Sequence, residues 1–201
     1  MNKRILLVGI SLVALVALAV VVVVLTSDYQ FEGVLIDPAQ PAPPINLMGS
    51  NGQEFHLEDY QGKVVLVFFG YTSCPDVCPS TLSDMKQVMA ALGDLADQVQ
   101  VVFVTVDPER DTVEKLGSYI GLFDARFLGL TGDEEALGQA WSGYGVYREI
   151  DTESQTAAGY LVNHSSRLYL INPEGKLALT YSFGTLPEDI AKDIKHILKE
   201  Q

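Results

Sequence analysis

Residues 63–106 read KVVLVFFGYTSCPDVCPSTLSDMKQVMAALGDLADQVQVVFVTV, and this pattern determines the fold that we predict. Residues 63–69 and 99–106 are nearly continuous runs of β-branched and aromatic side chains, which are typical of strands buried on both faces of a sheet. Between the two runs, four apolar residues recur at helical spacing: Leu82, Met85, Met89 and Leu92. The stretch therefore predicts a βαβ unit, in which a helix joins two parallel strands.

Two further helices are predicted after this unit. One begins at Asp111, which we interpret as the N-cap because Glu114 follows three residues later in a capping-box pattern. The other covers about residues 133–142.

The last part of the chain predicts two strands and a closing helix. Residues 167–183 give the strands, joined by a turn at Asn172–Gly175. The helix follows a cap formed by Thr185 and Glu188, with Pro187 in its first turn. A βαβ half followed by a ββα half predicts an α/β fold of the thioredoxin-like sandwich type.

The N-terminus carries a long apolar segment. Residues 5–25 contain no charged side chain and would span about 31 Å as a helix, enough to cross a bilayer. The run is longer than a secretory leader and lacks a small-x-small cleavage site, so we interpret residues 1–27 as a cytoplasmic N-terminus and an uncleaved transmembrane anchor. Because Lys3 and Arg4 precede the run, the remaining chain is expected on the far side of the membrane. That places the domain in the periplasm, or in the mitochondrial intermembrane space if the protein is eukaryotic.

The segment after the anchor differs in composition from the rest. Residues 28–44 contain four prolines and are predicted to form a semi-extended tether, which leaves residues 45–201 as one globular domain. Without Lys3 and Arg4, the net charge of −13 becomes −15 for the exported part. Such an acidic domain is not expected to bind nucleic acid.

Cys74 and Cys78 are the only cysteines of the chain, and a proline follows each of them. Because Pro75 and Pro79 disfavour helical backbone at the residue before them, we expect both cysteines outside regular helix, with Cys78 at the helix entry and Pro79 at the first helical position. The amides at a helix N-terminus stabilise an anion. We therefore predict a lowered pKa for the Cys78 thiol.

The spacing of the cysteines leaves two functional readings open. Residues four apart can form a disulfide in a turn. A structural bridge across so short a loop would restrain the unfolded chain only weakly, which favours a functional pair. Thiolates bind soft metals and also attack disulfides, so the pair alone does not distinguish a metal site from a redox couple.

Three motifs in this order resemble the Sco/SenC family, membrane-anchored thioredoxin-like proteins that handle copper for cytochrome c oxidase. They are GYTSCPDVCP (70–79), TVDPERDT (105–112) and NHSSRLYLINPEG (163–175). The resemblance covers the anchor and essentially the whole domain. It implies that the two motif cysteines and the histidine of the third motif, His164, bind copper.

His164 lies far along the chain from the cysteines. In a thioredoxin-like sandwich, the turn into the late hairpin lies beside the first βα loop, so the imidazole is expected to approach both sulfurs. Thioredoxins carry a cis proline near that turn, whereas HSSRL here contains none. We interpret His56 as a loop or strand residue and His196 as a helix surface residue.

The implied ligands determine which metal we expect. Two thiolates and one imidazole suit Cu(I) and can also hold Cu(II). Structural zinc normally takes four protein ligands, so zinc is the lesser alternative. At a three-ligand site, a cysteine or histidine of the protein that accepts the copper could bind the metal before a resident ligand leaves.

Other residues near the motifs have weaker claims to a role. Asp107 either forms the turn before Pro108 or acts as an outer-shell residue that orients His164 or meets a partner. Met85 and Met89 share a helix face and are expected to pack in the core. Tyr71 lies beside the cysteine loop, where it would cover the site or contact an acceptor.

The resemblance implies a copper carrier that delivers to the dinuclear copper site of cytochrome c oxidase subunit II, with an upstream copper donor. The alternative is a thiol-disulfide reductase in which Cys74 or Cys78 reduces the cysteines of that acceptor and a thioredoxin-like reductant restores the pair. A peroxide-reducing enzyme would need an activating arginine, for which Arg110 and Arg167 are candidates. The paired cysteines and the three motifs disfavour it.

Overall fold

The computed structural model describes residues 12, 15–18, 29–156 and 159–199. The anchor predicted over residues 1–27 falls mostly outside this part of the chain. Within the described residues, no helix has the length and apolar character needed to cross a membrane. The chain divides after Phe31, and the folded domain begins at Glu32.

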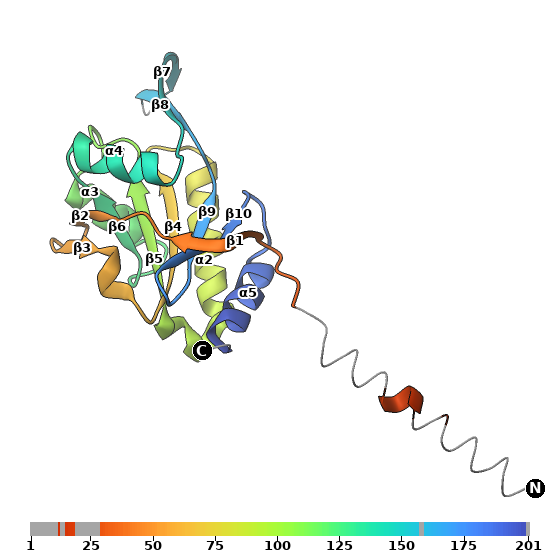
Figure 1. Cartoon of the computed structure of the whole chain (residues 1–201). Coiled ribbons are helices and arrows are strands. Elements are labelled where there is room, and N and C mark those ends of the chain that lie inside the picture. Colours follow the sequence, from red (N-terminus) through yellow and green to blue (C-terminus); the bar gives the residue numbers. More distant parts are fainter. Residues whose placement is uncertain (1–11, 13–14, 19–28, 157–158, 200–201) are drawn as a thin grey trace, which may run out of the picture. The chain divides into compact units, whose positions relative to one another are not determined.

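The domain is built on an eight-stranded mixed sheet (Figure 1). In sheet order the strands are β1 (Val34–Pro41), β10 (Lys176–Tyr181), β9 (Leu168–Ile171), β4 (Val64–Gly70), β5 (Val99–Thr105), β6 (Leu128–Thr131), β2 (Asn46–Gly49) and β3 (Glu54–His56). The predicted βαβ unit is confirmed, because β4 and β5 pair in parallel from Val64 opposite Val99 to Gly70 opposite Thr105. Every residue of β4 is buried, as its continuous apolar run predicts.

Helices cover both faces of the sheet. They are α2 (Val77–Leu92), α3 (Val113–Ile120), α4 (Glu134–Gly143) and α5 (Pro187–Lys199), with short 3₁₀ helices at Leu57–Tyr60 and Gly93–Gln98. Phe103 of β5 contacts Phe68 of β4 and Tyr119 of α3, on the face that α2 and its neighbour α5 also cover. On the opposite face, Phe69 packs against Tyr144, the residue that follows α4. The helix predicted over 133–142 is confirmed, with Asp133 as its N-cap.

Two predicted helix caps are wrong. The N-cap of α3 is Thr112, whose side chain accepts from the Lys115 amide, whereas Asp111 is fully buried. The Asp111 carboxylate instead accepts hydrogen bonds from Thr72 and Thr105. Thr185 does not cap α5 either, because its hydroxyl donates to the Ser182 carbonyl and the helix begins at Pro187.

The N-terminal segment differs from the predicted tether. Within residues 28–44, β1 pairs antiparallel with β10 and forms one edge of the sheet. An edge strand tolerates proline because the missing amide hydrogen can face away from the neighbouring strand. Pro38 and Pro41 therefore do not prevent pairing, although the register shifts between Leu35 and Gln40.

A second, two-stranded sheet was not predicted. It is the hairpin of β7 (Arg148–Thr156) and β8 (Gly159–His164), which projects beyond the main sheet in Figure 1. The predicted later hairpin, β9–β10, is confirmed with its turn at Asn172–Gly175. The β7–β8 hairpin matters for the site because its last residue is His164.

A buried carboxylate fastens the start of the domain to α5. Asp193 is fully buried and accepts hydrogen bonds from the backbone amides of Glu32 and Gly33 at 3.0–3.2 Å. The Tyr181 hydroxyl also donates to it, at 3.2 Å. These bonds join the residues before β1 to the end of β10 and to the last helix.

Replacing Asp193 with alanine should lower the free energy of unfolding by about 3 kcal/mol, because two amides and a hydroxyl lose a charged acceptor in a buried place. Urea denaturation of the full chain measures the change. Glu188→Ala, an exposed position in the same helix, is the matched control and should cost less than about 1 kcal/mol. An equal loss in both variants would contradict this role of Asp193.

Candidate metal centre

The cysteine loop connects the end of β4 to the start of α2. The Cys74 amide donates to the Tyr71 carbonyl at 3.2 Å, which forms a tight turn. Helix α2 begins at Val77 with Asp76 at the N-cap position. Cys78 therefore lies in the first helical turn, and the prediction that it precedes the helix is wrong. The helix can begin two residues earlier because a first-turn proline such as Pro79 needs no amide hydrogen.

Glycine at position 70 allows α2 to approach the end of β4 closely. A Cβ atom on Gly70 would lie 2.8 Å from Cys78 Sγ and 2.7 Å from the Phe103 ring. Both distances are too short for a real Cβ atom, so helix α2 and the Phe103 ring would have to move. The absence of a side chain here therefore determines the depth at which Cys78 is buried.

His164 faces Cys78 from the β7–β8 hairpin. Its Nε2 atom lies 3.6 Å from Cys78 Sγ, and its Nδ1 atom lies 2.9 Å from the Ser165 carbonyl oxygen. Because a carbonyl only accepts, Nδ1 carries the hydrogen and the Nε2 lone pair faces the sulfur. The ring packs edge-on against Phe68 and Tyr71, with centroids 6.3 and 5.8 Å away.

These three side chains bring their donor atoms together. The Sγ atoms of Cys74 and Cys78 and a ring nitrogen of His164 all lie within 4.8 Å of one another. Two donors bound to one ion at 2.0–2.3 Å are separated by about 3.5–4.0 Å, so the present spacing needs only a small contraction to hold a metal. The geometric prediction that the imidazole approaches the sulfurs is confirmed.

The two thiols differ in acidity, and the prediction for Cys78 is wrong. A hydrogen bond from the Cys78 thiol, more than any other contact, lowers the pKa of Cys74 to about 4. The Cys78 backbone amide, from the first turn of α2, also points at Cys74 Sγ at 3.5 Å. The same shared proton, together with burial, raises the pKa of Cys78. The helix N-terminus thus stabilises a thiolate, but on the half-buried Cys74.

Asp107 is not in contact with His164 in the described part of the chain. Its carboxylate is fully buried, pairs with the Arg110 guanidinium and accepts from the Tyr160 hydroxyl at 2.8 Å. Its carbonyl oxygen also accepts from the amides of Arg110 and Asp111, so it forms the predicted turn. Arg110 and Tyr160 connect Asp107 to the β7–β8 hairpin, which ends at His164.

The sequence analysis missed Asp111 as a residue of the site. Its buried carboxylate accepts from the Thr72 amide at 3.0 Å and from the Thr72 hydroxyl at 2.5 Å. The Thr105 hydroxyl donates to it at 2.8 Å. The capping-box pattern led us to assign Asp111 to the helix N-cap instead. Its place in a turn after a buried strand could have indicated a residue of the site.

The remaining candidates lie in other environments. Met85 and Met89 are buried in the core, as predicted. Tyr71 is only 2% exposed, so it packs beneath His164 and is not available to an acceptor. Of the two arginines considered for a peroxide site, Arg110 pairs with Asp107 and Arg167 donates to the Thr180 hydroxyl.

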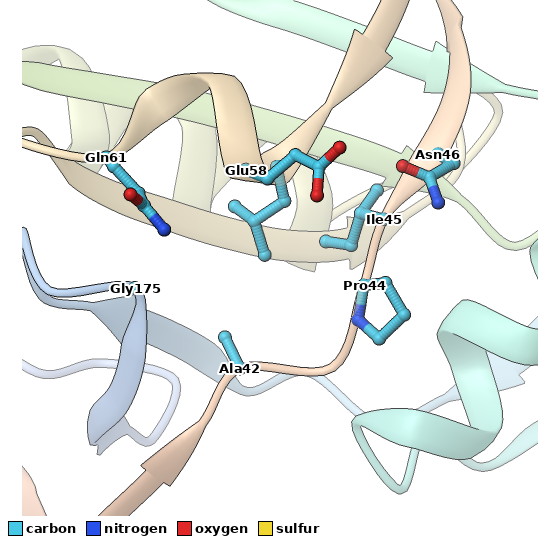
Figure 2. Close-up of a pocket in the computed structure, with 8 residues that line it drawn as sticks. Ala42, Pro44, Ile45, Asn46, Glu58, Gln61 and Gly175 are labelled. Atoms are coloured by element: carbon cyan, nitrogen blue, oxygen red, sulfur yellow. The ribbon is translucent and has the colours of Figure 1, made fainter.

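A hollow of about 190 Å³ lies near the start of β4, at the opposite end of that strand from the cysteine loop. Figure 2 shows the side chains around it. It is lined by Ala42, Pro44, Ile45, Asn46, Leu57, Glu58, Gln61 and Gly175. Gly175 belongs to the β9–β10 turn, which lies near the start of β4, whereas the cysteines follow its end. His56, which contacts Asn46 and Glu54, is likewise remote from the cysteines.

Comparison with known proteins agrees with this geometry. The model of the SCO1/SenC family matches residues 36–199. The chain belongs to the SCO1/SenC family. The mitochondrial SCO2 homologue of Mus musculus is 38% identical over 152 residues, which make up 75% of this chain and 59% of that protein. The match thus spans less than two thirds of the mouse protein.

Solved members of the SCO1/SenC family share the fold. ScoI of Bradyrhizobium japonicum with copper bound is 35% identical, with a TM-score of 0.71 over 77% of this chain and 98% of that chain. Yeast Sco1 with copper bound is 29% identical, with a TM-score of 0.72 over 81% of this chain and 90% of that chain. The thioredoxin-like α/β fold is therefore confirmed.

The pKa difference predicts how the thiols react with pH. Alkylation of Cys74 by iodoacetamide should remain nearly constant from pH 8 to pH 5 and fall through a midpoint near pH 4, while Cys78 stays unreactive. The unfolded thiol titrates near 8.5, so the Cys74 thiolate should favour folding increasingly as pH rises from about 4 to about 8.5. Mass spectrometry of the modified peptides measures both rates, and a Cys74 midpoint above pH 7 would contradict the assignment.

Proposed function

We propose that this protein is a copper carrier that binds one copper ion through Cys74, Cys78 and His164. The supporting observation is that these donors lie within 4.8 Å of one another although Cys78 and His164 are 86 residues apart, and that the Nε2 lone pair of His164 faces inward. Two family members of the same fold have structures with copper bound.

The donor types favour copper over other metals. Two sulfurs and one imidazole nitrogen suit Cu(I), and the nitrogen also supports Cu(II). Zinc in a structural site usually has four protein ligands, whereas the described cluster supplies three. Copper is cargo here, and it leaves when an acceptor supplies replacement donors.

The burial of the three donors suggests the order in which the copper ligands would be exchanged. Cys78 is fully buried, whereas Cys74 is half-buried and lies on the open side of the group. A donor from an acceptor would add to copper beside Cys74, and Cys74 would then be the first resident ligand to leave. Copper would pass between the two proteins without release into solvent.

The acceptor in this proposal is the dinuclear copper site of cytochrome c oxidase subunit II, as the motifs shared with the Sco/SenC family suggest. Residues 1–27 would anchor the chain in the inner membrane with the domain facing the periplasm, or the intermembrane space in a mitochondrion. The apolar run of residues 5–25 and the preceding Lys3 and Arg4 support this orientation.

Copper titration of the reduced full chain tests the carrier role. We expect one Cu(I) per wild-type chain, and Cys78→Ser should weaken binding at least 100-fold because a direct ligand is lost. Competition with a chromophoric Cu(I) chelator measures the affinity. His56→Ala is the matched control and should bind as the wild type does. Failure of the wild-type chain to bind copper would overturn the proposal.

A thiol-disulfide reductase is a second candidate, and the acidity of the cysteines favours it. Cys74 combines a pKa lowered to about 4 with partial exposure, as an attacking thiolate requires. Cys78 is buried beside it with its proton, as a resolving thiol would be.

The reductase reaction would proceed in two exchanges. Cys74 thiolate attacks one sulfur of an acceptor disulfide, forms a mixed disulfide and releases one acceptor thiolate. Cys78 then gives up its proton to the solvent or to the released thiolate and attacks Cys74 Sγ. The second acceptor thiol leaves, and the two electrons of the pair have passed to the acceptor.

His164→Ala separates the two candidates. Under the carrier role, the variant should lose at least tenfold in copper affinity, because one of three ligands is gone. Under the reductase role, reduction of a disulfide substrate should change by less than about twofold, because the imidazole is not a reacting group. Parallel measurements on one preparation decide which activity depends on His164, and unchanged copper affinity would exclude the three-ligand site.

A further inference from the structure

We propose that the segment 107–111 positions both halves of the copper site, with Arg110 holding the hairpin that carries His164 and Asp111 holding the cysteine loop. This inference rests on the proposed three-ligand site. It assigns separate positioning roles to two residues that do not belong to the ligand set, and the two roles can be tested independently.

Arg110 fastens the β7–β8 hairpin to the main sheet. Its Nη1 atom donates to the Tyr160 carbonyl at 2.9 Å, and its guanidinium lies 3.6 Å from the centre of the Tyr160 ring. Tyr160 belongs to β8, four residues before His164. The planar guanidinium can stack on an aromatic ring and donate hydrogen bonds at the same time, whereas a lysine ammonium has no planar face to stack.

The position of Arg110 is itself fixed by Asp107. The buried Asp107 carboxylate pairs with the Arg110 guanidinium through one oxygen and accepts from the Tyr160 hydroxyl through the other. The Tyr160 hydroxyl and the Tyr160 backbone carbonyl are therefore both hydrogen-bonded to the turn after β5. Because the Asp107 side chain is fully buried, loss of the Arg110 guanidinium would leave a buried charge without its partner, which favours this one geometry.

A second contact links the position of strand β8 to the position of the His164 imidazole. The Val162 amide of β8 donates to the Tyr71 hydroxyl at 3.3 Å, and the Tyr71 ring packs against the His164 imidazole. Val162 lies midway between Tyr160 and His164 in the strand. If Tyr160 leaves its place, Val162 and then the imidazole lose their support.

Asp111 acts on the other half of the site. It accepts from both the amide and the hydroxyl of Thr72, two residues before Cys74 in the loop. The Lys115 ammonium lies 3.5 Å from the same carboxylate and donates to the Ser73 hydroxyl at 3.3 Å. The loop before Cys74 is therefore held at two consecutive residues.

The two roles meet in one short turn. The Asp107 carbonyl accepts from the amides of Arg110 and Asp111 at 3.2 and 3.0 Å. The Thr105 hydroxyl accepts from the Asp107 amide and donates to the Asp111 carboxylate. The turn thus sets the separation between the hairpin and the cysteine loop, which is the separation between His164 and the sulfurs.

The first test measures amide hydrogen exchange in the metal-free full chain. Arg110→Gln should speed exchange of the Val162 amide at least tenfold and leave the Thr72 amide unchanged. Asp111→Asn should give the opposite pattern, because the Thr72 amide loses its charged acceptor. The matched controls are Arg126→Gln and Asp124→Asn, which alter an ion pair of 2.6 Å outside the site and should change neither amide.

The second test measures copper binding by the same variants. Arg110→Gln should weaken Cu(I) binding about 10- to 100-fold and reduce the nitrogen hyperfine coupling in the Cu(II) electron paramagnetic resonance spectrum. Asp111→Asn should also weaken Cu(I) binding but keep that nitrogen coupling, because it disturbs the cysteine loop and not the hairpin that carries His164. A role confined to overall stability would not alter the two signals separately.

Two gentler variants keep the test decisive if the first ones do not fold. Tyr160→Leu removes the stacking surface and leaves the Asp107 to Arg110 pair, and Thr72→Val removes one bond to Asp111. Separate effects on the hairpin and the loop support the proposal. Wild-type behaviour in all four variants, or equal changes at both amides, would overturn it, whereas failure of the wild type to bind copper would overturn the proposed function alone.

Discussion

The contact between His164 and Cys78 depends on one constraint, the placement of the β7–β8 hairpin over the ends of β4 and β5. The two residues are 86 positions apart, and their side chains meet at 3.6 Å. Among the residues that the structure describes, the hairpin pairs with no strand of the main sheet, so side-chain contacts hold it there. The site is therefore only as well ordered as the buried hydrogen bonds that fasten this hairpin.

Buried carboxylates perform this fastening throughout the domain. Asp107, Asp111 and Asp193 are fully buried, and each accepts at least two hydrogen bonds. A buried charge with all its partners adds geometric specificity more than net stability, because desolvation offsets much of the attraction. The acidic composition thus serves two purposes, with most carboxylates solvated at the surface and a few joining distant segments.

Local patterns predicted the βαβ unit and the β9–β10 hairpin, whereas the convergence of two cysteines with His164 followed from the resemblance to the Sco/SenC family and from the topology of the thioredoxin-like fold. Local patterns could not show which cysteine becomes the thiolate, because burial of Cys78 and the direction of its amide depend on how closely α2 approaches Gly70. Asp111 was misassigned for a related reason. Its capping pattern is local in the sequence. Its hydrogen-bond partners are Thr72, which follows β4, and Thr105, which ends β5. The prolines of β1 likewise indicated a tether because pairing with β10, far along the chain, is invisible to composition.

Strand β1 has a further consequence for handling the protein. It occupies the outer side of β10, and without it the amide and carbonyl groups of β10 would line an open border of the sheet. Such a border is a template for strand addition from another molecule. A shortened chain that starts after Pro41 would therefore be prone to self-association and precipitation, even with every copper donor in place.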